Sequence, residues 1–398
     1  MSQSANSDVI LSSFFQSQKS EVNFIERVIN RSNENIAVGG NIQYKIPIPA
    51  NSALDFESAM HTFKLTPSGA TAGNILKDFI IPYQTANLIF DGTIVESVTQ
   101  LVLTHQITKY LISKDQYDSE GYMNLGAHLT ESTRKQDFTI PLGYIFGTFN
   151  NAFLPGRAVK EITIEFTYVN SFDQIMDQTT TAGTVIVGIS NQSVVYRTIA
   201  LPVDMQKIVN ELVVKGLYKI KSLQKQSNIL TLNVTGGTVP DILSNRMAMV
   251  GMLCAPEVVG ISDDTSSYSF QNGESTKTIS NIQFEIDGVD YPSKSQNLSV
   301  NQGYNYSSTK QLFDSLMPLT NHQFGSCGCF TAYNSTDCFF GILLDNNLYN
   351  NTLDARECQR INLKYTWTTA PSAATTALII GYYIKIITIS DAGVSTQA

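Results

Sequence analysis

The sequence predicts an all-β protein made of two β-sandwiches in series, and its length, composition and strand pattern all indicate this. The chain has 398 residues, which suits two domains of roughly 200 residues each. Charged residues make up only 15%, below the usual value of about 25%, whereas Tyr (18) and Phe (20) are frequent beside a single Trp. Aromatic, β-branched and small polar residues in such a mixture favour sheets joined by turns.

The first half contains short apolar or alternating runs that begin at Asn41. They are IQYKIPIPA, FESAMHTFKLTP, NLIFDGTIVESVTQLVL, FTIPLGYIFG and KEITIEFTYV. Turn residues such as Asp91-Gly92 separate them, which is typical of a sandwich or barrel. Residues 98–113 have apolar residues near helical spacing and predict one helix carried in a loop. We therefore expect an N-terminal arm at residues 1–40, partly extended and partly helical, and a first sandwich at residues 41–203.

The second half repeats the pattern after a connector at residues 204–221. Its runs are LYKIKSL, NILTLNV, MAMVGMLCA, NIQFEIDGVDYP, CFFGILLD, INLKYTW and TALIIGYYIKIITIS. The last run is apolar on both faces, which predicts a central strand covered on both sides. We expect the second sandwich at residues 222–392 and a C-terminal tail at residues 393–398.

The two halves share one local pattern that indicates an internal duplication. Asp91-Gly92 follows a strand and precedes a helix-like stretch, and Asp287-Gly288 does the same before residues 307–316. Asp-Gly between two apolar runs is a strong hairpin signal. We therefore expect the two Asp-Gly pairs to be equivalent turns in matched strands.

Histidine and cysteine are the residues that could carry chemistry, and their spacing argues against it. None of the four histidines belongs to a metal-binding pattern, and replacing all four by Gln should leave assembly broadly intact unless one is a buried, hydrogen-bonded core residue. Among the five cysteines only Cys327-Gly328-Cys329 forms a tight pair, so small buried side chains are preferred over a zinc site. The odd, sparse set also favours a reducing compartment. These residues are His61, His105, His128, His322, Cys254, Cys327, Cys329, Cys338 and Cys358.

Glycine and aspartate pairs are better explained by turns than by a site. Gly39-Gly40 and Gly236-Gly237 lack the Lys-Ser/Thr that follows in a phosphate loop. Asp263-Asp264, and Asp287 with Asp290, resemble the carboxylate pairs of glycosidases, but they lie in expected loops and hairpin ends. The sequence therefore predicts no catalytic, cofactor-binding or metal-binding residue.

The charge of the chain excludes tight binding to nucleic acid. The net charge is -8 and the chain has no basic run, whereas phosphate binding requires a concentrated positive surface. The first 20 residues lack the features of a signal peptide, and no apolar run reaches the ~18 residues that span a bilayer.

Three segments, in the same order along the chain, carry a resemblance to a known family. They are residues 138–147 with 161–166 and 171–175, residues 284–294 with Tyr304 and Leu312-Phe313, and residues 361–365 through 378–380 and 386–387. At these residues the chain resembles the double jelly-roll major capsid proteins of Polintons, polinton-like viruses and virophages. Adenovirus hexon and the coat proteins of membrane-containing phages belong to the same lineage.

The resemblance implies a fold, partners and a location. Each half would be an eight-stranded jelly roll. Three chains would form a pseudo-hexagonal capsomer, with residues 22–38 ordered only in the assembly, and capsomers would tile an icosahedral shell around a viral DNA genome. The implied partners are other copies of the chain, penton and minor capsid proteins and, through the N-terminal arm, an inner membrane. The protein would be part of the virion, assembled inside the host cell, and not an enzyme.

Three alternatives remain open at this point. One is a penton or minor capsid protein of a similar virus. Another is a receptor-binding sandwich such as a fibre, which would explain the polar aromatic loops with Tyr304, Tyr306, Tyr333 and Tyr349 but should contain repeats or one terminal head. The third is a glycoside hydrolase, which should have several Trp for sugar stacking, whereas only Trp367 is present.

Overall fold

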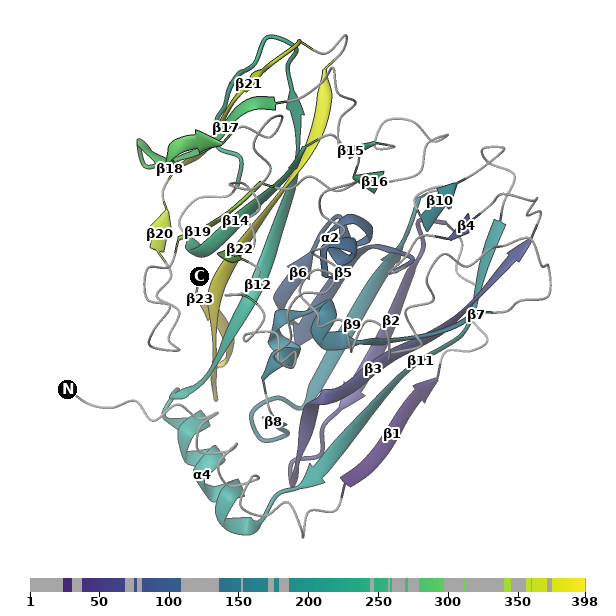
Figure 1. Cartoon of the computed structure of the whole chain (residues 1–398). Helices are drawn as coiled ribbons and strands as arrows, with labels where there is room; N and C mark the ends of the chain where they lie inside the picture. The colour runs from purple at the N-terminus through teal and green to yellow at the C-terminus, as the bar shows by residue number, and fades with distance from the viewer. Residues whose placement is uncertain are drawn as a thin grey trace.

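The computed structural model of the chain contains two β-sandwiches that stand side by side (Figure 1). It describes residues 24–30, 38–68, 75–76, 81–108, 136–151, 153–170, 175–178, 186–243, 247–256, 258–259, 269–270, 279–296, 311–312, 316, 340–344, 356–358, 360–370 and 374–397.

The first sandwich has two main sheets whose strands alternate between inward and outward residues. In β2 and β9, for example, every second residue is buried. This period of two is the reason why the apolar runs form strands with one face on a core. One sheet has the order β1 (Phe24–Asn30), β11 (Ile186–Ala200), β3 (Ser52–Ser68), β7 (Gln136–Pro141), with β8 (Phe153–Pro155) also on β3. The other has the order β2 (Asn41–Pro47), β9 (Glu161–Tyr168), β5 (Tyr83–Phe90), β6 (Thr93–Val98), and β4 (Ile75–Leu76) pairs separately with β10 (Met176–Gln178).

The second sandwich has the same construction. One sheet has the order β12 (Tyr218–Leu232), β22 (Thr375–Ser390), β14 (Met247–Pro256), β19 (Phe340–Leu343), with β20 (Arg356–Cys358) on β14 and β23 (Gly393–Gln397) on β22. The other has the order β13 (Gly237–Val239), β21 (Ile361–Trp367), β17 (Ile279–Ile286), β18 (Val289–Gln296), and β15 (Val258–Val259) pairs with β16 (Ser269–Phe270). As expected, β22 is central, between β12 and β14, and residues 377–384 are all buried.

The strand order identifies both sandwiches as jelly rolls. The eight main strands of the first half, in chain order, are β1, β2, β3, β5, β6, β7, β9 and β11; those of the second are β12, β13, β14, β17, β18, β19, β21 and β22. In each half the first, eighth, third and sixth strands form one sheet, and the second, seventh, fourth and fifth form the other. This arrangement is that of a jelly roll. The predicted fold class, two tandem jelly rolls, is confirmed.

The two Asp-Gly turns are equivalent, as the sequence predicted. Each joins the fourth strand of its jelly roll to the fifth. The φ angles are 44° and 88° at Asp91 and Gly92, and 51° and 80° at Asp287 and Gly288. Positive φ at both central residues is the geometry of the tight hairpin turn that Asp-Gly favours.

The aspartate of each turn also binds the same place in the neighbouring strand. The carboxylate of Asp91 accepts a hydrogen bond from the backbone N–H of Glu161, at 3.0 Å, where β9 begins. The carboxylate of Asp287 accepts one from the N–H of Arg360, at 2.8 Å, directly before β21. Because β9 and β21 are the seventh strands of their halves, the duplication extends to individual hydrogen bonds.

Replacing Gly92 or Gly288 by Val should lower the free energy of unfolding by about 1 kcal/mol or more. A Cβ at either position would meet no atom within 4 Å, so the loss would come only from the positive φ. Urea unfolding of each variant measures it, with Thr93→Val, at the start of β6, as the control. Equal stability of all three variants would mean that the turns tolerate a side chain.

Two boundaries differ from the sequence-based expectation. Residues 24–30, placed in the N-terminal arm, instead form β1, which pairs along its whole length with β11 and is part of the first sheet. Residues 393–397, placed in a tail, form β23 on the edge of β22. In both cases a short polar-apolar segment becomes a strand because a long neighbouring strand offers it unpaired backbone groups.

Two helical segments lie where the sequence placed them, whereas the two 3-10 helices and the helix of the connector were not predicted as helices. Helix α2 (Leu101–Thr108) follows β6, and Gln311, Leu312 and Leu316 are helical after β18. Two short 3-10 helices, η1 (Leu142–Tyr144) and η2 (Gly147–Asn150), follow β7. Helix α4 (Val203–Val214) occupies most of the predicted connector, and β12 already begins at Tyr218 within it. Figure 1 shows α4 at one end of the molecule, joining the two jelly rolls.

Candidate functional site: the junction between the jelly rolls

The two jelly rolls share a buried junction, which we define as residues 95–99 of β6 and its end, residues 144–148 of η1 and η2, and residues 222–227 of β12. The lower parts of β12 and β22 run beside the first jelly roll (Figure 1). Their apolar side chains belong to its core: Tyr218, Ile220, Ile387 and Ile389. The two halves are therefore packed against each other and share part of one hydrophobic core.

Gly147 is a point of close approach between the two halves. A Cβ at this position would lie 2.7 Å from the carbonyl carbon of Leu223 in β12 and would overlap its oxygen. Only a residue without a side chain allows η2 and β12 to approach in this way. The sequence analysis did not single out Gly147, although a Gly that ends the apolar run FTIPLGYIFG was a possible signal.

Glu96 places a carboxylate in the middle of the junction. Its side chain is 1% exposed and accepts hydrogen bonds from the backbone N–H of Gly147 (2.8 Å) and of Thr148 (3.0 Å). The hydroxyl of Thr148 donates a further hydrogen bond to it, at 2.8 Å, and lies 3.0 Å from the hydroxyl of Ser222 in β12. Glu96 thus fixes η2, and η2 is in turn bonded to the second jelly roll.

Residues of β12 complete the polar contacts across the junction. The side chain of Gln224 donates to the carbonyl of Val95 at 3.1 Å, and the ammonium of Lys225 donates to the carbonyl of Tyr144 at 3.1 Å. Further along, the hydroxyl of Ser227 donates to the carbonyl of Thr99 at 2.8 Å. Backbone carbonyls of the first half are thus bound by side chains of the second, which fixes the register between them.

Burial shifts the pKa values of the ionisable side chains at and near the junction. Removal from water raises the pKa of Glu96, against the hydrogen bonds from Thr148 and Gly147 and the charge of Lys225. Burial lowers the pKa of Lys225 to about 8, against the attraction of Glu96. His105, on α2, has its pKa lowered to about 3 by burial and so is neutral at pH 7.

His61, the second described histidine, lies in the core of the first jelly roll. Its Nδ1 donates to the carbonyl of Ser193 at 3.1 Å, and its Nε2 lies 2.8 Å from the hydroxyl of Tyr83. The side-chain amide of Gln192 is 3.1 Å from the same hydroxyl. Burial lowers the pKa of His61 to about 4, so the ring is neutral and structural. It is therefore the kind of buried, hydrogen-bonded core histidine that was named as an exception; His128 and His322 lie outside the described residues.

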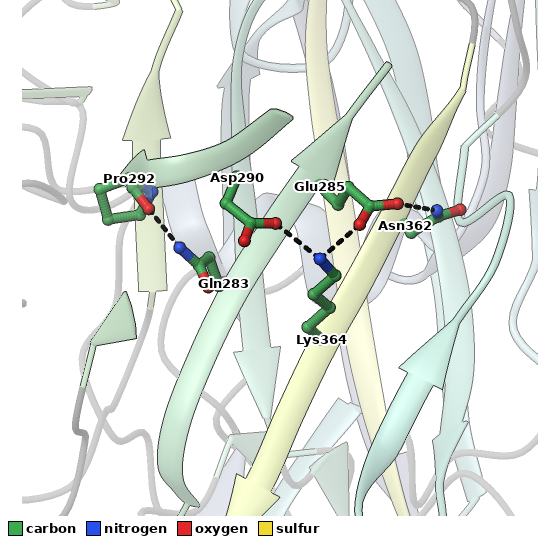
Figure 2. A network of polar contacts seen from close by, with 6 residues as sticks. All are labelled: Gln283, Glu285, Asp290, Pro292, Asn362 and Lys364. Atoms are coloured by element: carbon green, nitrogen blue, oxygen red, sulfur yellow. Dashed lines mark hydrogen bonds and ion pairs between the residues drawn. The ribbon is translucent and has the colours of Figure 1, made fainter. Parts of the chain in front are cut away.

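An exposed polar cluster on the second jelly roll brings one amine between two carboxylates. Figure 2 shows Lys364 of β21 paired with Asp290 of β18, at 2.7 Å, and with Glu285 of β17, which also accepts a hydrogen bond from Asn362. An amide cross-link would need a neutral amine and a protonated acid. The hydrogen bond to Asp290 instead raises the pKa of Lys364, and the bond from Lys364 lowers that of Glu285. The cluster is held together by ion pairs between charged groups.

The other candidate residues from the sequence are not brought together. Asp287 binds the N–H of Arg360 and Asp290 binds Lys364, so they do not act as a carboxylate pair. Cys254 and Cys358 are buried thiols in β14 and β20. Gly39, Gly236 and Gly237 all have positive φ, as turn residues do. Cys327, Cys329, Cys338 and Asp263-Asp264 lie outside the described residues.

The described residues contain no group of three or more His, Cys, Asp or Glu that could hold a metal ion. No helix in this part of the chain is long and apolar enough to cross a membrane.

Large apolar side chains are exposed on a few elements, a feature that the sequence analysis missed. They gather on the edge strands and on α4, where the sequence alone does not show which face is covered. They are Ile25 and Val28 on β1, Ile94 on β6, Val289 on β18, and Val203, Ile208, Val214 and Leu217 on or just after α4, with Val38 before β2.

No protein-family model matches the chain, and no curated protein matches it.

Solved structures, in contrast, match almost the whole chain. A Faustovirus major capsid protein superposes with a TM-score of 0.60 and 9% identity, covering 93% of this chain and 91% of its own. A chain of the PBCV-1 virus capsid gives 0.57 and 13%, with coverage of 95% and 97%. The mavirus major capsid protein gives 0.50 and 10%, with coverage of 94% and 90%. The class of the chain is thereby defined: it is a double jelly-roll protein.

Proposed function

We propose that the chain is a major capsid protein, which forms homotrimeric, pseudo-hexagonal capsomers that tile an icosahedral shell around a viral DNA genome. The observation that carries the proposal is the double jelly roll itself, which extends over nearly the whole chain, as it does in capsid proteins of Faustovirus, PBCV-1 and mavirus. On this proposal the protein is part of the virion capsid.

The junction supports a mechanical function and not a catalytic one. A shell subunit must keep its shape while neighbours bind to it. The hydrogen bonds and packing across the junction hold the two jelly rolls together as one body. Enzyme sites usually gather perturbed acids, bases or thiols in a cleft. The perturbed groups Glu96 and His105 are instead buried inside the protein, and Lys225 is half-buried at the junction. We propose that no residue of the chain is catalytic or binds a cofactor or metal.

The strand pairing indicates where each domain of the chain begins and ends. We propose that residues 1–23 are the arm, that the first jelly roll extends from β1 to β11, that α4 is the connector, and that the second jelly roll extends from β12 to β23. Neighbouring capsomers, penton and minor capsid proteins would be the partners, and the arm would contact them or an inner membrane.

Purification of the full chain tests the proposal. Light scattering should give three times the mass of the chain, and electron microscopy should show particles with a pseudo-hexagonal outline. A chain that stays monomeric at high concentration, or a specific hydrolytic activity that a histidine substitution abolishes, would contradict the proposal.

Removing the arm should separate its function from that of β1. Deletion of residues 1–23 should leave the trimer folded but weaken or redirect shell assembly. Deletion of residues 1–38 also removes β1, which uncovers the edge of β11 and the part of the core that Ile29 packs against, so the thermal midpoint should fall and aggregation should rise. Scattering, thermal unfolding and microscopy compare the two. Identical shells from the full chain and the shorter deletion would remove the assigned function of the arm.

A further inference from the structure

The contact between the two jelly rolls of one chain includes, beside η1 and η2, a contact between two edge strands. β12 is the edge strand of one sheet of the second jelly roll, and β6 is the edge strand of one sheet of the first. They meet through Gln224 and Val95 and through Ser227 and Thr99. Part of each of these strands is therefore covered by the other half of the same chain.

Because the fold is duplicated, each of these edge strands has a counterpart. β1 is the first strand of the first jelly roll, as β12 is of the second, and β18 is the fifth strand of the second, as β6 is of the first. Figure 1 shows β1 and β18 on opposite outer sides of the molecule. They repeat the two halves of the internal contact but do not meet each other within one chain.

The counterpart strands β1 and β18 expose large apolar side chains. On β1, Val28 is 56% and Ile25 is 52% exposed, and on β18, Val289 is 50% exposed. Tyr291 stands opposite Phe284 as Glu96 stands opposite Leu88 in the first half. Yet Glu96 is fully buried beneath the junction, whereas Tyr291 is only half-buried. Isolated apolar residues on a surface are common, but here they fall on both of the strands that the duplication pairs.

We propose that β1 of one chain binds the β18 edge of the second jelly roll of another copy, in the way that β12 binds β6 within the chain. This inference rests on the proposed function and names the surface that holds the capsomer together. A contact between two different surfaces of the same chain is heterologous. Such contacts form a closed ring when each one rotates the next chain by a whole fraction of 360°, for example by one third. Internal and intermolecular contacts would then alternate around the ring.

A charge-swap experiment on the full chain tests this pairing. Val28→Lys and Val289→Asp each place one charge in the contact, and the double variant places opposite charges on its two sides. Each single variant should raise the concentration at which the trimer is half dissociated about a hundredfold, because a buried charge without a partner is costly. The double variant should recover most of that loss. Val203→Lys is the matched control: Val203 is a 65% exposed valine on α4, outside both strands, and its variant should associate like the original chain.

The outcomes separate this inference from the proposed function. Circular dichroism first checks that each variant is folded, which is expected because the side chains are exposed. A stable trimer that neither single variant weakens, that the control weakens equally, or that the double variant fails to restore would overturn the β1–β18 contact and leave the capsid proposal standing. An original chain that does not trimerise at any concentration would overturn the capsomer itself.

Discussion

Replacing Gly147 by Ala should uncouple the two jelly rolls and lower the free energy of unfolding by about 3 kcal/mol, at the upper end of overpacking effects. The new methyl group would overlap the carbonyl oxygen of Leu223. That carbonyl is held within β12, which pairs along its whole length with the central strand β22, so neither backbone can move without breaking strand pairing. Urea unfolding measures the change, and a single transition should separate into two as the halves lose their contact.

Gly143→Ala provides the matched control, four residues earlier in the same turn region. Its Cβ would lie 2.6 Å from Oδ1 of Asn150, which is the end of a flexible side chain and not backbone. Asn150 can turn away at the expense of its hydrogen bond to the carbonyl of Gly143, which contributes about 1 kcal/mol. If the two alanine variants lose the same stability, the approach of Gly147 to β12 is not what joins the halves.

Strand periodicity made most of the fold predictable. The run EITIEFTY in β9 alternates strictly, and the long apolar run of β22 matches a strand that is covered on both faces. The Asp-Gly pairs were informative for another reason: each combines a local turn preference with a hydrogen bond to the seventh strand, so the same dipeptide recurs at the same place in both halves.

β1 could not be recognised from its own residues. In FIERVIN the apolar residues stand at positions 24, 25, 28 and 29, a spacing that fits a helix as well as an edge strand. β1 becomes a strand because it pairs with the edge of β11, which lies over 150 residues later in the sequence. The pairing begins with Phe24 opposite Ile199. Tertiary pairing of this kind overrides local preference.

The junction was equally hidden, because its partners are remote in sequence. Glu96 lies in the run TIVESV, where a charged residue next to an apolar one usually points to solvent. Its burial depends on Gly147 and Thr148, 51 and 52 residues away, and on β12 of the other half. No local pattern shows that a polar residue of one sandwich will be covered by another sandwich.

The buried charges of the junction should give two variants with opposite pH dependence. Lys225→Met leaves the carboxylate of Glu96 buried without its cation and should cost about 3 kcal/mol near neutral pH. Because burial raises the pKa of Glu96, the folded chain takes up a proton more readily than the unfolded chain. The loss is therefore full above the folded pKa of Glu96 and shrinks as the pH falls through it towards the ordinary carboxyl pKa of 4.5.

Glu96→Gln should behave in the reverse way. It leaves the half-buried ammonium of Lys225 without the charge of Glu96, which raises the pKa of that group. The folded pKa of Lys225 therefore falls below its value of about 8 in the original chain, and the loss is full below that folded pKa. Above it the folded chain releases the proton while the unfolded chain keeps it up to its ordinary pKa near 10.5, so stability recovers with rising pH. Urea unfolding at about pH 5, 7 and 9.5 measures both variants. Lys364→Met, which removes the exposed ion pair of Figure 2, is the control and should change stability much less. Parallel pH curves for Lys225→Met and Glu96→Gln would show that the two charges do not face each other across the junction.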